Sequence, residues 1–182
     1  MSLYKNQFRI ESVRLKTWDY RNSSWYFVTI NTKNQTEYFG KIINGAVELN
    51  DLGKTAKKYW LEIPIHFPFA ELDYYTIMPN HTHSVIIINS KDVACNVSTK
   101  KSIYSEISPK QYSLSSIIRS YKSAVTRWCN KNDIQFEWQV RFFDRIIRDE
   151  KELYNIRKYI EQNPLKRILE KDGPDNIDWD LI

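Results

Sequence analysis

The feature that most constrains this chain is the stretch at residues 78–89, which reads Met-Pro-Asn-His-Thr-His-Ser-Val-Ile-Ile-Ile-Asn. Its second half is a run of β-branched apolar residues, which is typical of a strand buried on both faces. Side chains alternate across an extended segment, so His81 and His83 are expected to point to one side and Thr82 to the other. Two imidazoles on one face predict two ligands of a metal site. The alternative is a pair of hydrogen-bonded surface histidines, and only a third ligand and a reactive group would decide between the two.

The composition is that of an ordinary soluble protein, with 182 residues of which 42% are hydrophobic and 27% charged. A net charge of +5 and a pI near 9.1 favour an anionic partner such as nucleic acid. Cys95 and Cys129 are isolated thiols, as in a reducing cytoplasm. No apolar run approaches the roughly 20 residues of a membrane span. We therefore expect one soluble cytoplasmic domain over residues 1–182, with an N-terminal arm at 1–24, a long loop at 90–111 and a tail at 165–182.

Hydrophobic periodicity predicts an α+β fold. Apart from one hairpin, the expected elements follow the ferredoxin-like order β-α-β-β-α-β and end with an additional helix. In such a sheet the first and third strands are central, which suits the apolar strand after the histidines. The expected elements are a strand at 25–31, a helix at 51–63, a strand at 71–78, a strand ending in 85–88, a helix at 114–130, a strand at 138–148 and a final helix from 149.

Local signals predict where several elements begin or turn. Asn44-Gly45 predicts a tight turn between hairpin strands at 36–43 and 46–49. Asp51 and Ser113 are the residue types that cap helix N-termini, so we expect the first two helices to begin at them.

The final helix carries the second group of candidate site residues. Pro164 predicts that this helix ends by Asn163, because the residue before a proline avoids the helical conformation. On a helical projection Tyr159 lies at the edge of the apolar stripe, and Asn163 follows one turn later on the same side. An inward amide without a partner costs about 1–3 kcal/mol. The alternatives are a helix C-cap role for Asn163 and a half-buried core position for Tyr159. The apolar stripe consists of Leu153, Ile156 and Ile160.

Several short motifs follow one another in a fixed order along the chain. They are Met-Pro-Asn-His-Thr-His at 78–83, Tyr-Lys-Ser at 121–123, Trp-Gln at 138–139, Phe-Asp-Arg-Ile-Ile-Arg at 143–148 and Tyr-Ile-Glu-Gln-Asn-Pro at 159–164. Together with Tyr-Phe-Gly-Lys at 38–41, Leu-Gly-Lys at 52–54 and the segment 60–68, this combination resembles the REP-associated tyrosine transposases, a branch of the single-tyrosine HUH transposases. The resemblance covers roughly residues 25–165.

The resemblance implies a single-stranded DNA endonuclease and strand transferase that forms a 5′-phosphotyrosine on hairpin-flanked DNA. Tyr159 falls on the nucleophile, His81 and His83 on two metal ligands, and Asn163 on the third. Imidazole ligands would suit Zn²⁺, whereas a site that leaves coordination positions open for phosphate oxygens suits Mg²⁺ or Mn²⁺, and the resemblance favours the latter two. Members of this group occur as monomers and as homodimers, and the sequence does not choose between them.

Two residues depart from the family pattern beside the histidines. Thr82 stands where a bulky hydrophobe is usual, and Ser84 stands where glycine or an aliphatic residue is commoner. A hydroxyl packs less well in a core than the hydrophobe it replaces, so we expect a looser site.

Five basic residues are candidates for binding the DNA backbone, and aromatic residues for stacking on unpaired bases. The alternative for each cation is an ordinary solvated surface position. Two other functions stay open: a catalytically weakened or domesticated nucleic-acid-binding module of the same fold, and a metal-dependent hydrolase that uses water. The five candidates are Arg119, Lys122, Arg141, Arg145 and Arg148, with Lys122 preferred because it lies in the Tyr-Lys-Ser motif.

Overall fold

The structure is a computed structural model that describes residues 3–4, 7–8, 18–89 and 112–169, with side chains described at 18–89 and 112–164. The expected loop at 90–111, most of the expected arm at 1–24 and the end of the expected tail lie outside these residues. The described elements are β1 (Leu3–Tyr4), β2 (Gln7–Phe8), β3 (Ser24–Asn31), the short 3₁₀ helix η1 (Lys33–Gln35), β4 (Gly40–Ile43), β5 (Ala46–Leu49), α1 (Asp51–Leu61), α2 (Ile63–His66), β6 (Ala70–Met78), β7 (His81–Ile88), α4 (Leu114–Lys131), β8 (Phe143–Ile147) and α5 (Glu150–Leu169).

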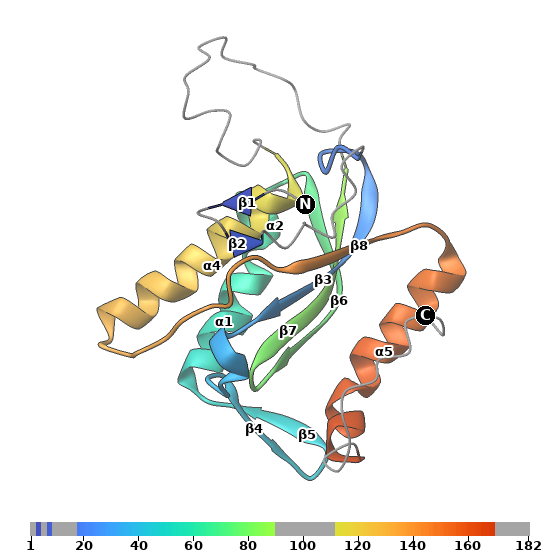
Figure 1. Cartoon of the computed structure of the whole chain (residues 1–182). Helices are drawn as coiled ribbons and strands as arrows, with labels where there is room; N and C mark the ends of the chain where they lie inside the picture. Colours follow the sequence, from blue (N-terminus) through green and yellow to red (C-terminus); the bar gives the residue numbers. More distant parts are fainter. Residues whose placement is uncertain (1–2, 5–6, 9–17, 90–111, 170–182) are drawn as a thin grey trace.

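The centre of the fold is a four-stranded antiparallel sheet with the strand order β6-β7-β3-β8. The predicted ferredoxin-like arrangement is confirmed, with the first and third strands, β3 and β7, in the middle. Helices α1 and α4 cover one face of this sheet, while α5 crosses the other (Figure 1). None of the helices in the described part of the chain is long and apolar enough to cross a membrane.

Alternation along the two central strands divides the core between the two faces. On the α1 and α4 side, Tyr26, Val28 and Ile30 of β3 belong to the larger buried cluster. On the α5 side, Phe27 and Val85 form a smaller cluster with the stripe predicted for the final helix. That stripe, Leu153, Ile156 and Ile160, is buried against the sheet as expected.

Three element boundaries differ from the expectations. The cap of α1 is Asn50, whose side chain accepts a hydrogen bond from the Gly53 N–H, and Asp51 is the first helical residue. Both residue types cap helices well, so sequence alone did not separate them. The first hairpin strand is shorter than expected, and the last strand is limited to β8 because only an isolated bridge from Trp138 to Thr32 precedes it. The Asn44-Gly45 turn is confirmed by positive φ at both residues, and Ser113 caps α4 as predicted.

The prediction that the final helix ends before Pro164 is wrong, because α5 continues to Leu169. A proline inside a helix removes one backbone hydrogen bond and crowds the carbonyl four residues earlier, but here the helical conformation continues on both sides of Pro164. Asn163 therefore lies inside the helix, and its alternative role as a C-cap is excluded.

Gly53 lies where α1 meets the chain just before β4, and its position permits a stability prediction. A Cβ atom at this position would overlap the backbone carbonyl of Phe39 and come within 2.9 Å of the Leu49 side chain. We expect Gly53→Ala to lower the free energy of unfolding by about 2–3 kcal/mol, because overpacking against rigid backbone outweighs the better helix propensity of alanine. Urea denaturation of Gly53→Ala and of the exposed control Lys57→Ala measures the difference, and equal stability of the two variants would refute this account.

Candidate functional site

The two histidines of β7 lie on the face of the sheet that α5 covers. Their ring centroids are 4.4 Å apart, and His83 is buried while His81 is half-buried. Thr82 between them is completely buried on the opposite face. The alternation predicted from the His-x-His spacing is therefore present in the sheet.

Asn80 fixes the orientation of the His81 ring. Its side-chain oxygen lies 2.6 Å from His81 Nδ1, so Nδ1 carries a proton and donates to it. Asn80 is itself buried, and two contacts fix its position. Its side-chain Nδ2 donates to the Gln35 backbone carbonyl at 3.1 Å, and its backbone carbonyl accepts from the Thr32 N–H and hydroxyl. Such outer contacts are the usual way in which proteins orient a metal-binding imidazole.

His83 is kept neutral by its surroundings. Burial and, secondarily, the neighbouring His81 lower its pKa well below the ordinary value of 6.5. Its ring stacks on Phe27 with centroids 5.5 Å apart, and Nδ1 lies 2.8 Å from the Thr29 hydroxyl. A neutral imidazole at this position has one nitrogen that accepts, as a metal ligand or a hydrogen-bond acceptor requires.

Tyr159 brings its phenol to the second nitrogen of the same ring. Its hydroxyl lies 3.3 Å from His83 Nε2, and its ring packs edge-on against Phe27 at 6.1 Å. Because His83 is neutral, one of its two ring nitrogens donates and the other accepts in the contacts with the Tyr159 and Thr29 hydroxyls. The structure therefore places the sequence-predicted tyrosine beside the sequence-predicted histidine pair, within one chain.

Two ion pairs hold α5 in this position from both sides. Arg157 Nε donates to the Asp73 carboxylate of β6 at 2.8 Å, and Arg145 Nε of β8 lies 2.7 Å from the Glu152 carboxylate. These pairs join α5 to the two edge strands through Glu152 and Arg157, which both precede Tyr159 on the helix. They are partly exposed, so they contribute to positioning more than to stability.

Asn163 is buried in α5 one helical turn after Tyr159, with 9% of its surface exposed. The described residues contain no cluster of three or more His, Cys, Asp or Glu side chains able to hold a metal. A cation at the histidine pair would therefore need an amide or other neutral oxygen as its third protein ligand. Asn163 is the residue of that chemistry that the sequence predicts.

The basic candidates are distributed over both faces of the sheet. Arg119 is exposed on α4, on the face opposite the histidines, while Arg145 lies on the histidine face in its ion pair with Glu152. Arg141 and Arg148 are exposed just before and just after β8. The structure therefore does not gather these residues into one patch around the histidines.

Lys122 has a structural role that the sequence did not indicate. Its ammonium donates to the carbonyls of Gln139 at 2.7 Å and Arg141 at 2.9 Å, while Trp138 Nε1 donates back to the Lys122 carbonyl. Partial burial lowers the pKa of Lys122 to about 8, whereas the two carbonyl acceptors favour its charged form. Two of its three donors are thus used to hold the segment before β8, which leaves at most one for a phosphate.

The departures from the family pattern lie on the reverse side of the histidine strand. Thr82 and Ser84 are fully buried there, and their hydroxyls make no well-formed hydrogen bond within the described residues. The Thr82 hydroxyl lies near the phenol of Tyr121, whose pKa is raised by burial. The Ser84 hydroxyl has no partner among the described residues, and a buried hydroxyl without a partner is costly.

Three residues that support the site were not predicted, namely Asn80, Thr29 and Asp73. Asn80 could have been found from its place directly before the first histidine, since a metal-binding imidazole usually donates its other ring N–H to a hydrogen-bond acceptor. The other two are brought to the site by strand pairing and helix docking, for which the local sequence carries no signal.

Two proteins of Haemophilus influenzae are similar to this chain in sequence. No family model matches the chain. A Haemophilus influenzae protein described only as uncharacterized is 40% identical over 157 residues, which span 85% of this chain and 87% of the relative. A putative REP-associated tyrosine transposase of the same organism is 26% identical over 154 residues, covering 81% of this chain and 74% of that protein.

A solved structure of a REP-associated tyrosine transposase bound to a REP hairpin is also similar. It matches with a TM-score of 0.59 and 18% identity, covering 87% of this chain and 74% of that chain. This likeness shows a common fold. The 40% identity to the uncharacterized Haemophilus influenzae protein shows that the two chains are related over most of their lengths. The protein thus has the fold of the REP-associated tyrosine transposases and belongs to the same family as the uncharacterized Haemophilus influenzae protein.

Proposed function

We propose that this protein is a tyrosine transposase that nicks and joins single-stranded DNA through a 5′-phosphotyrosine intermediate. The observation that carries the proposal is the position of the Tyr159 hydroxyl, 3.3 Å from Nε2 of a buried neutral histidine. A phenol on a packed helix beside a histidine pair is a suitable arrangement for nucleophilic catalysis.

In the proposed reaction, the Tyr159 oxygen attacks the scissile phosphorus and the bond from phosphorus to the 3′ oxygen breaks. The downstream strand becomes joined to the protein through its 5′ phosphate, and the upstream strand leaves with a free 3′ hydroxyl after taking up a proton. The phenol has an ordinary pKa of about 10, so its proton must be accepted by a neighbouring group as the oxygen attacks. Because the phosphotyrosine conserves the energy of the broken bond, a 3′ hydroxyl can reverse the step without ATP.

The donor set fits a divalent cation. His81 would coordinate through Nε2, because its Nδ1 donates to Asn80, and His83 would coordinate through Nε2 once the Tyr159 phenol moves away from that nitrogen; the buried amide of Asn163 would supply an oxygen. We infer that these three residues hold Mg²⁺ or Mn²⁺. When bound, such a cation would polarise a phosphate oxygen and neutralise charge that develops in the transition state.

The substrate is inferred to be hairpin-flanked single-stranded DNA. The net charge of +5 favours an anionic partner, and the described REP-associated neighbour is bound to a REP hairpin. Arg119, Arg141, Arg145 and Arg148 remain candidate phosphate contacts, with Lys122 limited to a supporting contribution.

A second candidate function is a nucleic-acid-binding module of the same fold with a weakened catalytic site. The buried hydroxyls of Thr82 and Ser84 behind the histidine strand favour it, because polar groups buried without a well-formed hydrogen bond lower the stability of the strand that carries the histidines.

End-labelled DNA distinguishes these functions. We expect 3′-labelled single-stranded hairpin DNA incubated with Mn²⁺ to give a radiolabelled protein–DNA adduct on a denaturing gel, and 5′-labelled DNA to give a shorter free strand instead. EDTA should prevent both products. Tight binding with no cleavage would identify the binding module, and cleavage of both substrates without adduct would identify a hydrolase that uses water.

A further inference from the structure

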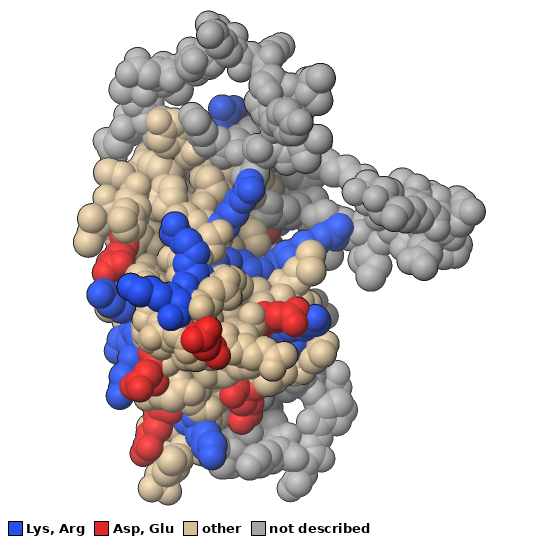
Figure 2. Space-filling model, turned by 90° about the vertical axis from the view of Figure 1, so that its left-hand side faces the viewer, with Lys and Arg blue, Asp and Glu red and all other residues tan. Residues whose placement is uncertain are grey.

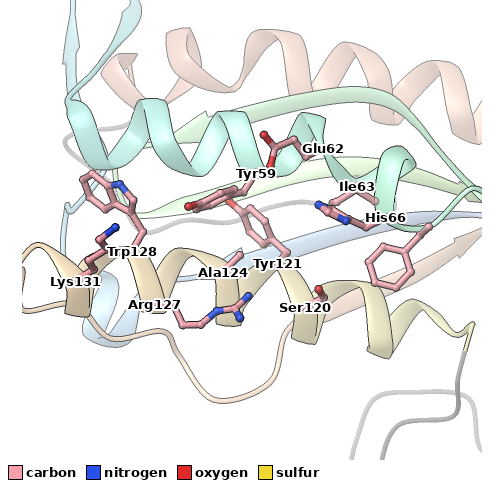
Figure 3. A pocket seen from close by; sticks show the side chains of 11 residues that line it. Tyr59, Glu62, Ile63, His66, Ser120, Tyr121, Ala124, Arg127, Trp128 and Lys131 are labelled. Carbon is pink, nitrogen blue, oxygen red and sulfur yellow. The ribbon is translucent and has the colours of Figure 1, made fainter.

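A cavity of about 480 Å³ lies between α1, α2 and α4, on the face of the sheet opposite the histidines and Tyr159. Its volume is within the range of about 300–1,000 Å³ that ligand pockets occupy. Tyr59 and Tyr121 lie at its centre, with Trp128 and Lys131 towards one end and His66 towards the other (Figure 3). Nothing in the chemistry proposed for the histidine face uses this cavity.

The rim of the cavity carries more positive than negative charge. Arg127 and Lys131 are exposed on α4, and neither forms an ion pair with any described residue. Glu62 is the acidic lining residue, but its carboxylate points away from α4 and lies 3.9 Å from Lys58 Nζ (Figure 3). The cations on α4 are therefore available to an anion from solution.

The same cations continue a basic stripe along the helix. Arg127 and Lys131 are four residues apart and therefore neighbours on one side of α4, and Arg119 lies about two turns earlier and about 80° around the helix from Arg127; all three are exposed. Viewed from the side on which α1 and α4 lie, the molecule shows Lys and Arg side chains gathered across its middle, with fewer Asp and Glu among them (Figure 2). A row of phosphates can follow such a stripe past the mouth of the cavity.

The cavity also presents aromatic surface. Tyr59 from α1 and Trp128 from α4 are half-buried, so part of each ring is accessible from the cavity. Cations spaced along a helix beside accessible rings are the combination that proteins use to bind single strands, with phosphates on the cations and bases on the rings.

We propose that this cavity, lined by Tyr59, Trp128, Arg127 and Lys131, binds an unpaired nucleotide of the DNA substrate, with its base against the rings and its phosphates on the two cations. The site is a second DNA contact, separated from the histidines by the sheet. This proposal rests on the proposed function in one respect: the DNA strand bound in the cavity is the strand that is cut on the histidine face.

Binding in EDTA tests the site without any DNA chemistry. We expect Arg127→Gln/Lys131→Gln to weaken binding of a fluorescein-labelled single-stranded oligonucleotide by at least tenfold at low salt. The slope of log K against log salt should fall by about 1.4, because two phosphate contacts of a single strand are lost. The control Lys54→Gln/Lys57→Gln removes the same charge from α1 outside the cavity and should change the affinity by less than threefold.

The base contact is tested by Tyr59→Ala and by photocrosslinking. Tyr59→Ala should weaken binding by about tenfold with little change in the salt slope, since a stacking contact is lost and no phosphate contact. An oligonucleotide carrying 5-iododeoxyuridine should crosslink to a peptide containing Tyr59 or Trp128. Equal affinities and salt slopes for the two double variants, or crosslinks confined to the histidine face, would overturn the proposal. If the unmodified protein forms no adduct with DNA but these binding results are as expected, only the proposed nicking activity is refuted.

Discussion

Replacing Tyr159 by phenylalanine should abolish the protein–DNA adduct and lower the rate of strand cleavage at least about 1,000-fold, as removal of a catalytic nucleophile does. The substitution keeps the ring packed against Phe27 and removes only the hydroxyl that lies 3.3 Å from His83 Nε2. The loss of one partly buried hydrogen bond costs about 1 kcal/mol, so the variant should fold and melt close to the unmodified protein. Denaturing gels with 3′-labelled hairpin DNA, together with thermal melting, measure both effects.

Tyr154 provides the matched control for this experiment. It is on the same helix, but 65% of its surface is exposed and it points away from the sheet. Tyr154→Phe should therefore retain full adduct formation. Cleavage that persists in Tyr159→Phe with undiminished rate would show that water or another residue attacks the phosphate, and the transposase mechanism would be abandoned.

Tyr159→Phe also gives information on the metal. In the structure the phenol lies 3.3 Å from Nε2 of His83, and this is the same nitrogen that a cation would use. A cation that binds there must displace the phenol from that nitrogen. The phenylalanine variant should accordingly bind Mn²⁺ at least as tightly as the unmodified protein, which isolates the loss of the nucleophile from any loss of the metal.

The sequence predicted the histidine face well because the signals for it are local. Alternation along β7 is a property of any extended strand, so the direction of His81 and His83 followed once the apolar run had identified the strand. The direction of Tyr159 on α5 was predictable for a similar reason: the apolar stripe beside it had to be buried, so Tyr159 had to lie at the edge of the buried side. Local periodicity therefore sufficed to bring the two sequence-distant parts of the site onto facing surfaces.

Other features depend on tertiary contacts and could not be predicted in the same way. Lys122 was preferred as a DNA contact because of its motif, yet its ammonium meets two carbonyls of a segment that packs beside α4 only in the folded chain. The end of α5 was placed at Asn163 because of a local rule for proline, whereas the helix continues to Leu169. The rule describes the preference of the residue before proline, and here Asn163 keeps the helical conformation, so the helix passes through Pro164.

His81→Ala should lower the affinity for Mn²⁺ by at least about 100-fold, since removal of an imidazole leaves the remaining ligands too few for a stable site. His81 suits this test better than His83 because it is half-buried and its ring is not packed on Phe27, so its removal should leave the fold intact. DNA binding in EDTA should be unchanged. Isothermal titration calorimetry with Mn²⁺ and anisotropy with labelled DNA measure the two affinities.

His66→Ala is the control for nonspecific imidazole binding, because His66 is exposed on α2 and lies on the other side of the sheet. It should leave the Mn²⁺ affinity unchanged. A positioning role for Asn80 predicts an intermediate result: Asn80→Ala keeps both histidines but frees the His81 ring, which should cost about 10–100-fold in metal affinity. Equal Mn²⁺ affinities of the His81, Asn80 and His66 variants would mean that the histidine pair is a hydrogen-bonded core feature and holds no cation.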